Sequence, residues 1–330
     1  MQLYKYPSIG QFRNVISEVK YLYKDKQLPT IEFIGTVKLH GTNASVVIKS
    51  DGTQYCQSRS NIITPDNDNY GFARWHQTRI DFFNDIYEQV TDYADCNGND
   101  IVVYGEWAGK GIQKGVGISQ VDKHFYVFAI AIANQDGSLR WIDFAKMPYI
   151  ENGDDVFDIY NFDIPLYTHR IEIDFNNPNL VQNKLIELTE QIENLCPVAK
   201  HFDVEGVGEG IVWSHVTDDG EQLIFKVKGE KHSSTKVKKL ASVDVEKLNS
   251  VMEFVEYAVT ESRLKQALFE VCNDVADRTQ LGKFIKWVSS DISKEEQDTL
   301  KENELTMKDV GSQLSKKAKE WFFEQENKQQ

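Results

Sequence analysis

The pattern of hydrophobic residues changes once along this chain of 330 residues, at about residue 240. Between residues 31 and 239, short runs rich in β-branched and aromatic residues alternate with a few helical stretches, which favours a sheet-based domain. From about residue 242 the apolar residues recur every three or four positions among many charges, which is typical of amphipathic helices. We predict an α+β fold with two domains, residues 1–239 built of antiparallel sheets with flanking helices and residues 240–330 small and all-helical.

Local patterns predict the elements of the first domain. Predicted strands occupy residues 31–39, 44–49, 101–107, 125–133, 210–214 and 222–228. One amphipathic helix is predicted from Trp75 to Tyr93, and a second follows Asn177-Pro178 and ends near Leu195. In the second domain, Ser293 with Glu296 has the form of a capping box and predicts the start of a short helix.

The strand predicted for residues 222–228 has one apolar face and one face that ends in Lys226 and Lys228. Side chains two residues apart share a face of a strand, so both ammonium groups point the same way. They repel each other unless an anion lies between them, and a phosphate is the obvious candidate. The alternative is an ordinary solvated strand face. Lys38 and His40, just before Gly41, have the same spacing, and we predict that they share a strand face.

Composition excludes several classes of protein. Hydrophobic residues make up 41% of the chain, and the longest apolar run, residues 125–133, is too short for the roughly 18 residues of a membrane span. The start of the sequence lacks the apolar stretch of a signal peptide, so we expect a soluble, intracellular, cytoplasmic protein, and we expect a monomer. The four cysteines have no CxxC spacing, which predicts free thiols and no zinc site.

Charge is distributed unevenly along the chain. The formal net charge of −14 argues against non-specific coating of nucleic acid. Lysines are nevertheless concentrated between Lys226 and Lys239, where Glu230 is the single acidic residue. This basic track is either an electrostatic footprint for nucleic acid or a solvated linker between domains.

Further candidate residues stand in order between Lys38 and Lys226: Asn43, Arg59, Glu106 after Gly105, Phe128, and Glu209 before Gly210. This order of short motifs resembles the covalent nucleotidyltransferase superfamily of polynucleotide ligases and mRNA capping enzymes. It is most similar to the RNA ligase 2-type family of bacteriophages and their relatives. The resemblance implies an adenylyltransferase domain and an ATP-dependent RNA ligase that seals 3′-hydroxyl and 5′-phosphate ends through a lysyl-AMP intermediate. Its expected partner is duplex RNA that contains a nick. Its expected role is RNA repair, including repair in a phage-infected host cell.

The resemblance also implies a role for each motif residue. Lys38 would be the nucleophile, and His40 would act on the departing pyrophosphate. The ATP site would be formed by Val37, Leu39, Asn43, Arg59, Glu106, Phe128, Lys226 and Lys228, with Phe128 stacked on adenine and the two lysines on the phosphates. Glu209 would bind Mg²⁺, with Mn²⁺ as the alternative metal. The chain departs from the family at two positions, because Val37 replaces an acidic residue and Ala129 stands where an aspartate is typical.

Physical chemistry makes this arrangement reasonable. A lysine at its reference pKa of about 10.4 is protonated at pH 7, and freeing its lone pair costs roughly 4 to 5 kcal/mol. A nearby divalent cation, or a neighbouring lysine, favours the neutral amine and reduces that cost. Magnesium held by a carboxylate such as Glu209 would also neutralise charge on the phosphates.

Several alternatives remain open from the residues alone. Residues 109–115 are rich in glycine and lysine, but they lack the phosphate-loop spacing and are interpreted as a loop beside Glu106. Glu205 competes with Glu209, and the strand predicted directly after Glu209 favours the latter. A capping-type guanylyltransferase is disfavoured by His40, where an aspartate is common, and by the helical second domain in place of an OB-fold. A non-catalytic RNA-binding relative is disfavoured by the intact lysines.

Overall fold

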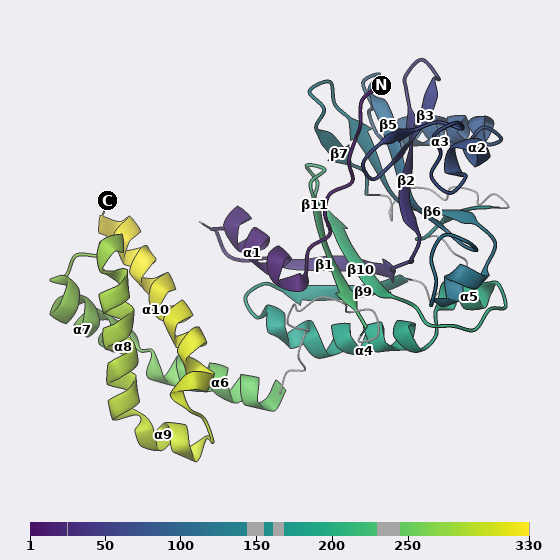
Figure 1. Cartoon of the computed structure of the whole chain (residues 1–330). Coiled ribbons are helices and arrows are strands. Elements are labelled where there is room, and N and C mark those ends of the chain that lie inside the picture. Colours follow the sequence, from purple (N-terminus) through teal and green to yellow (C-terminus); the bar gives the residue numbers. More distant parts are fainter. Residues whose placement is uncertain (25, 144–154, 161–167, 230–244, 330) are drawn as a thin grey trace. The chain divides into compact units, whose positions relative to one another are not determined.

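The computed structural model describes residues 1–24, 26–143, 155–160, 168–229 and 245–329 (Figure 1). Contacts divide the chain into two compact units, Met1–Ser242 and Val243–Gln330. The boundary predicted near residue 240 and the lysines of the basic track beyond residue 229 lie outside the described residues.

Two sheets form the first unit. The four-stranded sheet is antiparallel throughout, in the order β11 (Gln222–Lys228), β10 (Gly210–Val216), β1 (Thr30–Val37), β9 (Thr168–Asp174). The seven-stranded sheet has the order β4 (Ile62–Ile63), β3 (Gln54–Ser58), β2 (Thr42–Ile48), β5 (Asp100–Ala108), β6 (His124–Ala133), β7 (Leu139–Trp141), and β8 (Val156–Asp158) pairs in parallel with β6. An α+β fold with predominantly antiparallel sheets is thereby confirmed.

Helices cover one face of each sheet (Figure 1). The four-stranded sheet carries α1 (Phe12–Leu22) and α4 (Gln182–Asn194), while α2 (Phe72–His76) and α3 (Ile80–Tyr93) lie against the seven-stranded sheet. A short helix, α5 (Pro197–His201), follows α4. The helix predicted after Asn177 begins instead with a 3₁₀ turn, Pro178–Val181.

Alternation along β11 produces the core of the four-stranded sheet, as predicted. Leu223, Phe225 and Val227 are buried against the helices, whereas Lys226 and Lys228 stay on the other face. On the neighbouring strands, Trp213 of β10 is paired with Gly35 of β1 in the strand register. A Cβ at Gly35 would lie 2.7 Å from the Trp213 ring, so this close approach requires glycine.

The prediction of a single helix from Trp75 to Tyr93 is wrong, because the chain forms two helices there, α2 and α3, with a non-helical break between them. Arg79 stands at this break and turns to Asp155, with Nη2 2.7 Å from Oδ2 and Nε 2.9 Å from Oδ1. Trp75 donates its indole N–H to the same carboxylate. This two-point ion pair accounts for Arg79, a charged residue in a stretch where apolar residues otherwise recur every three or four positions.

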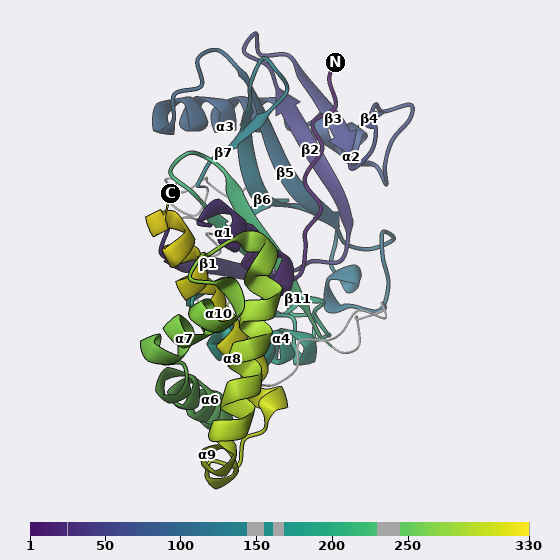
Figure 2. The same cartoon turned by 90° about the vertical axis from the view of Figure 1, so that its left-hand side faces the viewer.

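The second unit is a helical bundle with its own core (Figure 2). It contains α6 (Val245–Ala258), α7 (Glu261–Cys272), α8 (Leu281–Glu295), α9 (Gln297–Glu302) and α10 (Met307–Gln329). The helix start predicted at Ser293 is wrong, since that residue lies inside α8. No helix in the described part of the chain is both long and apolar enough to cross a bilayer.

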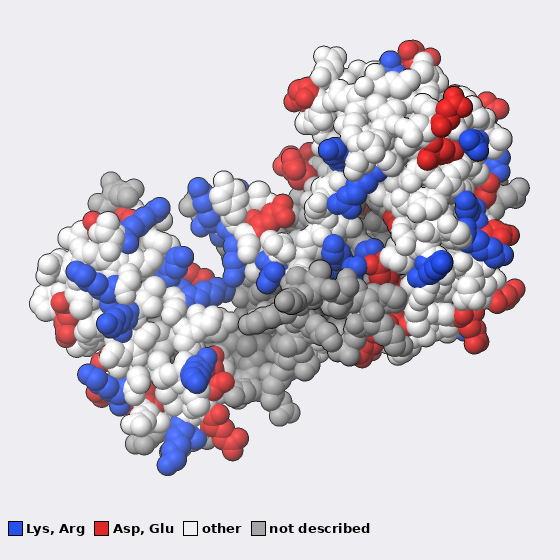
Figure 3. All heavy atoms as spheres, in the orientation of Figure 1, with Lys and Arg blue, Asp and Glu red and all other residues white. Residues whose placement is uncertain are grey.

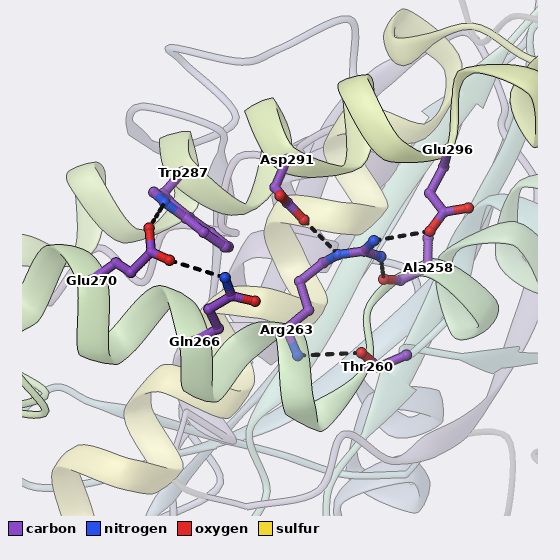
Figure 4. A network of polar contacts seen from close by, with 8 residues as sticks. All are labelled: Ala258, Thr260, Arg263, Gln266, Glu270, Trp287, Asp291 and Glu296. Carbon is purple, nitrogen blue, oxygen red and sulfur yellow. Dashed lines mark hydrogen bonds and ion pairs between the residues drawn. The ribbon is translucent and has the colours of Figure 1, made fainter.

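Arg263 is the centre of a polar network in this bundle (Figure 4). Its Nε lies 2.8 Å from Asp291 Oδ2 and its Nη2 lies 2.9 Å from Glu296 Oε1, while Nη1 donates to the Ala258 carbonyl. The Arg263 side chain is only 15% exposed. One guanidinium therefore links the end of α6 to α7 and α8.

Candidate active site

A pocket of about 490 Å³ is lined by residues of both sheets of the first unit. The four-stranded sheet contributes the end of β1 and residues along β10 and β11, and the other sheet contributes residues of β2, β5 and β6. The lining residues predicted from the sequence are Val37, Lys38, Leu39, His40, Asn43, Arg59, Glu106, Phe128, Lys226 and Lys228. Val37 and Lys228, which are 191 positions apart in the sequence, are thus brought to one cavity.

Lys38 lies just past β1, which ends at Val37 and not at residue 39, so the prediction that Lys38 and His40 share a strand face is wrong. The Lys38 backbone N–H nevertheless donates to the Gly210 carbonyl at 2.8 Å, which continues the ladder toward β10. On its other side, Gly210 is paired with Lys228 of β11 in the strand register. This register places the two lysine side chains at one edge of the pocket.

Glu209, directly before β10, joins these two lysines. Its Oε2 lies 2.6 Å from Lys38 Nζ, and its Oε1 accepts a hydrogen bond from Lys228. His40 Nδ1 is 3.5 Å from the same Oε2. The Glu209 side chain is 4% exposed, so a buried carboxylate holds two ammonium groups in fixed positions. Neither Glu209 nor Glu205, the competing candidate, lines the pocket itself, but Glu209 is buried against two lining lysines whereas Glu205 is exposed.

Electrostatics differ between the charged groups of the site. Burial raises the pKa of Glu209, but the charges and hydrogen bonds of Lys38 and Lys228 outweigh it and hold that pKa below its ordinary value. Burial lowers the pKa of Lys226, and the positive charges of Lys228 and Lys38 lower it further. Within the described part of the chain, the Lys226 side chain forms no hydrogen bond or ion pair. Lys226 is therefore a cation of the site with an open capacity for an anion.

A tight turn at Gly41 connects β1 to β2. The Gly41 N–H donates to Glu106 Oε1 at 2.9 Å, and Gln113 donates to the Gly41 carbonyl. A Cβ at Gly41 would lie 2.3 Å from the Trp107 carbonyl oxygen, so the turn requires glycine. Burial raises the pKa of Glu106 to about 7, against the opposing charge of Lys38. The Glu106 carboxyl therefore holds its proton more strongly than an exposed glutamate does.

Phe128 enters the pocket because of an irregularity in β6. The pairing with β5 runs from Tyr104 and Ala129 directly to Gly105 and Val127, so Phe128 is an extra residue in the ladder. Such a bulge re-aims a side chain, and bulges are common beside active sites. Tyr6 packs edge-on against the Phe128 ring with a centroid distance of 5.0 Å.

Sequence patterns did not predict all of the residues that line the pocket. The N-terminal segment from Tyr6 to Ile9 lines the pocket, and Ser8 accepts a hydrogen bond from Arg59 at 3.2 Å. Ile159 and Tyr160 also contribute, and no periodic pattern marks them. By contrast, strand alternation could have found Ser214, because it shares a face with Val212 on β10.

The glycine- and lysine-rich residues 109–115 do not form a phosphate cradle. Lys110 pairs with Asp122 on the surface, and Gln113 is the residue of this loop that contacts the Gly41 turn. The interpretation as a loop near Glu106 agrees with these contacts. All four cysteines are buried and free, as expected.

The oxygen ligands near the pocket suit a divalent metal that is shared with a substrate. Among the described residues, no three His, Cys, Asp or Glu side chains are grouped as metal ligands. In nucleotide sites, however, Mg²⁺ keeps several waters and uses one or two carboxylates together with substrate phosphates. Glu209, a carboxylate beside three cationic side chains that suit phosphate, fits such a shared site.

Comparison with known proteins identifies the family. Residues 31–228 match the model of the RNA ligase family. Among solved structures, a variant of the RNA ligase of Naegleria gruberi with AMP and Mn is similar at 17% identity, with a TM-score of 0.42 and 70% of this chain covered. An apo variant of the same ligase gives 18% identity, a TM-score of 0.44 and 71% coverage. The chain matches 58% and 60% of the lengths of those two chains. Because the family model spans every candidate residue from Val37 to Lys228, this chain belongs to the RNA ligase family.

Proposed function

We propose that this chain is an ATP-dependent RNA ligase that joins 3′-hydroxyl and 5′-phosphate ends through a lysyl-AMP intermediate. The observation that carries the proposal is the position of the Lys38 amine, which is 2.6 Å from Glu209 and lines one pocket with Lys226 and Lys228. A lysine at the edge of a cationic pocket is suited to attack a phosphate.

In the first step, Lys38 Nζ attacks the α-phosphorus of ATP. The Lys38 ammonium group first gives up one proton to solvent; an N–P bond then forms, the bond from phosphorus to the bridging oxygen breaks, pyrophosphate leaves, and Nζ gives up a second proton to solvent. Glu209 keeps Nζ in place through its 2.6 Å contact. Lys226 and Lys228 stabilise the negative charge that grows on the phosphates, and preorganised charges of this kind are a large source of catalysis.

A divalent metal, Mg²⁺ or Mn²⁺, would be held by Glu209 and substrate phosphates and would supply additional positive charge at phosphorus. The Naegleria gruberi variants with AMP and Mn or with ATP and Mn are consistent with both ligands. Phe128 offers its ring to a base, and Glu106 and Asn43, adjacent in the β2–β5 register, offer polar groups to a ribose. His40, whose side chain is 36% exposed beside the Glu209 carboxylate, would interact with the departing pyrophosphate.

Two later steps complete the reaction. A 5′-phosphate oxygen of RNA attacks the AMP phosphorus and releases Lys38, and the 3′-hydroxyl then attacks the 5′-phosphate and releases AMP. We propose that the break is a nick in duplex RNA and that the helical unit contributes to RNA binding. The visible surface of that unit carries basic residues interspersed with acidic residues (Figure 3). An RNA-binding face on this unit would therefore use only part of its surface.

The first step is tested by incubating the protein with α-³²P-ATP and Mg²⁺. Wild type is expected to acquire an acid-labile label, and Lys38→Ala is expected to acquire none. Lys49→Ala is the matched control, because Lys49 is a partly exposed lysine outside the pocket that pairs with Asp51. Label on Lys38→Ala, or no label on wild type with ATP, would contradict the proposal, and label from GTP alone would indicate a capping-type guanylyltransferase.

The RNA substrate is tested with nicked duplexes in which single ribonucleotides are replaced. Sealing that requires ribonucleotides at the 3′-hydroxyl side and fails on all-DNA nicks supports an RNA ligase. RNA binding by a protein that forms no label would instead indicate a non-catalytic relative.

A further inference from the structure

The end of the pocket remote from the lysines is built mainly of apolar side chains. The strand registers define successive levels across the four-stranded sheet. Lys228 is level with Gly210, and Lys226 is level with Val212. The next level contains Ser214, flanked by Ile224 on β11 and Ile34 on β1. Since two residues of a strand span roughly 6.6 Å, Ser214 lies one such step beyond the lysine level.

Ser214 is paired with Tyr160 at this end. The two hydroxyl oxygens are 3.0 Å apart, and Ser214 is 9% exposed. Phe128, Tyr160 and Ser214 also border a second cavity of about 100 Å³, which none of the pocket lysines lines. These three residues therefore form the end wall of the main pocket, with an aromatic ring and a hydroxyl pair in place of charge.

Chemistry favours one direction for this hydrogen bond. A phenol is a stronger acid than an aliphatic alcohol, so Tyr160 Oη is the favoured donor and Ser214 Oγ the acceptor. Burial raises the pKa of Tyr160 to about 12, although the bond to Ser214 opposes the shift, and the phenol keeps its proton at neutral pH. The Ser214 hydroxyl then has its own proton left to donate into the pocket.

A nucleotide whose phosphates occupy the lysine end directs its base toward this wall. Val37 and Ala129 carry no polar side-chain atom, so neither can form a side-chain hydrogen bond to a base edge. An adenine ring presents the unprotonated nitrogen N1 on its Watson–Crick edge, whereas guanine carries a proton there. A hydroxyl donor next to a stacking ring is suited to the former.

We propose that the Ser214 hydroxyl, held in orientation by Tyr160, donates a hydrogen bond to adenine N1 and so selects ATP. Ser214 is the specificity residue and Tyr160 is its positioning residue. This assignment rests on the proposed function only in that the pocket must bind ATP.

The test measures equilibrium binding of ATP, 1-deaza-ATP and 7-deaza-ATP without added divalent metal. Wild type is expected to bind ATP about three- to tenfold more tightly than 1-deaza-ATP, the range of one net hydrogen bond, and to bind 7-deaza-ATP like ATP. Ser214→Ala is expected to bind ATP weakly and to lose this discrimination. Tyr160→Phe keeps the ring and is expected to reduce the ratio in part. The control Tyr55→Phe removes a hydroxyl that bonds Gln2 outside the pocket and is expected to leave the ratio unchanged.

Equal affinity of wild type for ATP and 1-deaza-ATP would overturn the assignment, as would an undiminished ratio in Ser214→Ala or no binding of ATP. Thermal unfolding of each variant reports whether it is folded. The labelling of Lys38 is measured separately. Wild type that discriminates between the analogues but acquires no label would contradict the ligase while supporting the role of Ser214.

Discussion

The Lys38 ammonium group and the Glu209 carboxylate meet at 2.6 Å although 171 residues separate them in the sequence. Lys38 follows β1 and Glu209 precedes β10, so the antiparallel pairing of these two strands creates the contact. The other carboxylate oxygen is engaged by Lys228 of β11. One buried acid thus fixes two cations from two different strands, and both remain at the pocket.

Glu209→Gln tests this arrangement. A neutral amide cannot offset two ammonium charges, so Lys38 and Lys228 should move apart and the amine should lose its position. We expect the initial rate of Lys38 labelling by α-³²P-ATP to fall at least tenfold, because a misplaced nucleophile reacts more slowly. Glu205→Gln, which changes an exposed acid outside the pocket, should label at the wild-type rate. An unchanged rate in Glu209→Gln would show that the carboxylate is dispensable.

Gly41→Ala tests the turn that follows Lys38. The added methyl would meet the Trp107 carbonyl at 2.3 Å and Ala108 Cβ at 2.7 Å, so the turn must shift and the hydrogen bond to Glu106 must lengthen. We expect more than tenfold slower labelling and a lower Tm. Gly311→Ala in α10 has open space around its Cβ and should stabilise the helix by about 0.5–1 kcal/mol. Normal labelling in Gly41→Ala would contradict the proposed need for this turn.

Strand periodicity explains which site residues could be predicted. The two-residue period of β11 placed Lys226 and Lys228 on one face, and the burial of Phe225 on the opposite face follows from the same pattern. Glu209 could be preferred over Glu205 because a strand begins immediately after it. In both cases a local pattern carried the information.

Long-range geometry explains what could not be predicted. Phe128 enters the pocket through a bulge in β6, and the run of apolar residues around it carries no mark of the register change. Tyr6 reaches the site from a segment without regular secondary structure, held by packing against Phe128 and by a hydrogen bond to Gln222. Arg79 lies within the single helix predicted from Trp75 to Tyr93, but in the structure it stands between two helices and pairs with Asp155.

The raised pKa of Glu106 predicts a pH dependence of stability. Its pKa is about 7 in the folded protein against a reference of 4.5, because burial disfavours the charged form. Between these values the folded state binds more protons than the unfolded state, so the free energy of unfolding falls as pH rises through this window and levels off above it. At about 1.36 kcal/mol per pKa unit, the full difference is on the order of 3 kcal/mol.

Urea unfolding of wild type and Glu106→Gln at several pH values measures this effect. Other titrating groups cancel in the comparison, so the advantage of Glu106→Gln should grow from pH 4.5 to 7 and then stay constant. Parallel curves for the two proteins would show that Glu106 titrates at its ordinary pKa.

Arg263 is expected to stabilise the helical unit. Removing it as Arg263→Met leaves Asp291 and Glu296 without their shared cation, and breaking a largely buried pair on one side costs about 3 kcal/mol. Arg263→Lys keeps the charge but loses the planar fork and should recover only part of the loss. Lys265→Ala, which removes an exposed pair with Glu261, should change stability by less than about 0.5 kcal/mol. Thermal unfolding followed by circular dichroism checks all three, and equal effects of Arg263→Met and Lys265→Ala would refute the role of the network.

The charge of Lys226 should lower the stability of the folded protein and strengthen the binding of ATP. Burial and the charges of Lys228 and Lys38 disfavour its ammonium form, so the folded state carries a penalty that is present at neutral pH and is relieved as pH rises through the lowered pKa. Lys226→Met keeps the aliphatic stem and removes the charge. We therefore expect a Tm at pH 7 that is higher by on the order of 2 °C and an affinity for ATP that is at least tenfold weaker, because the open cation for phosphate is gone. Lys49→Met, at a lysine outside the pocket, should change neither quantity. If Lys226→Met lowers both Tm and ATP affinity, Lys226 supports the fold. If Tm rises while ATP affinity falls, the charge of Lys226 serves ligand binding at the expense of stability.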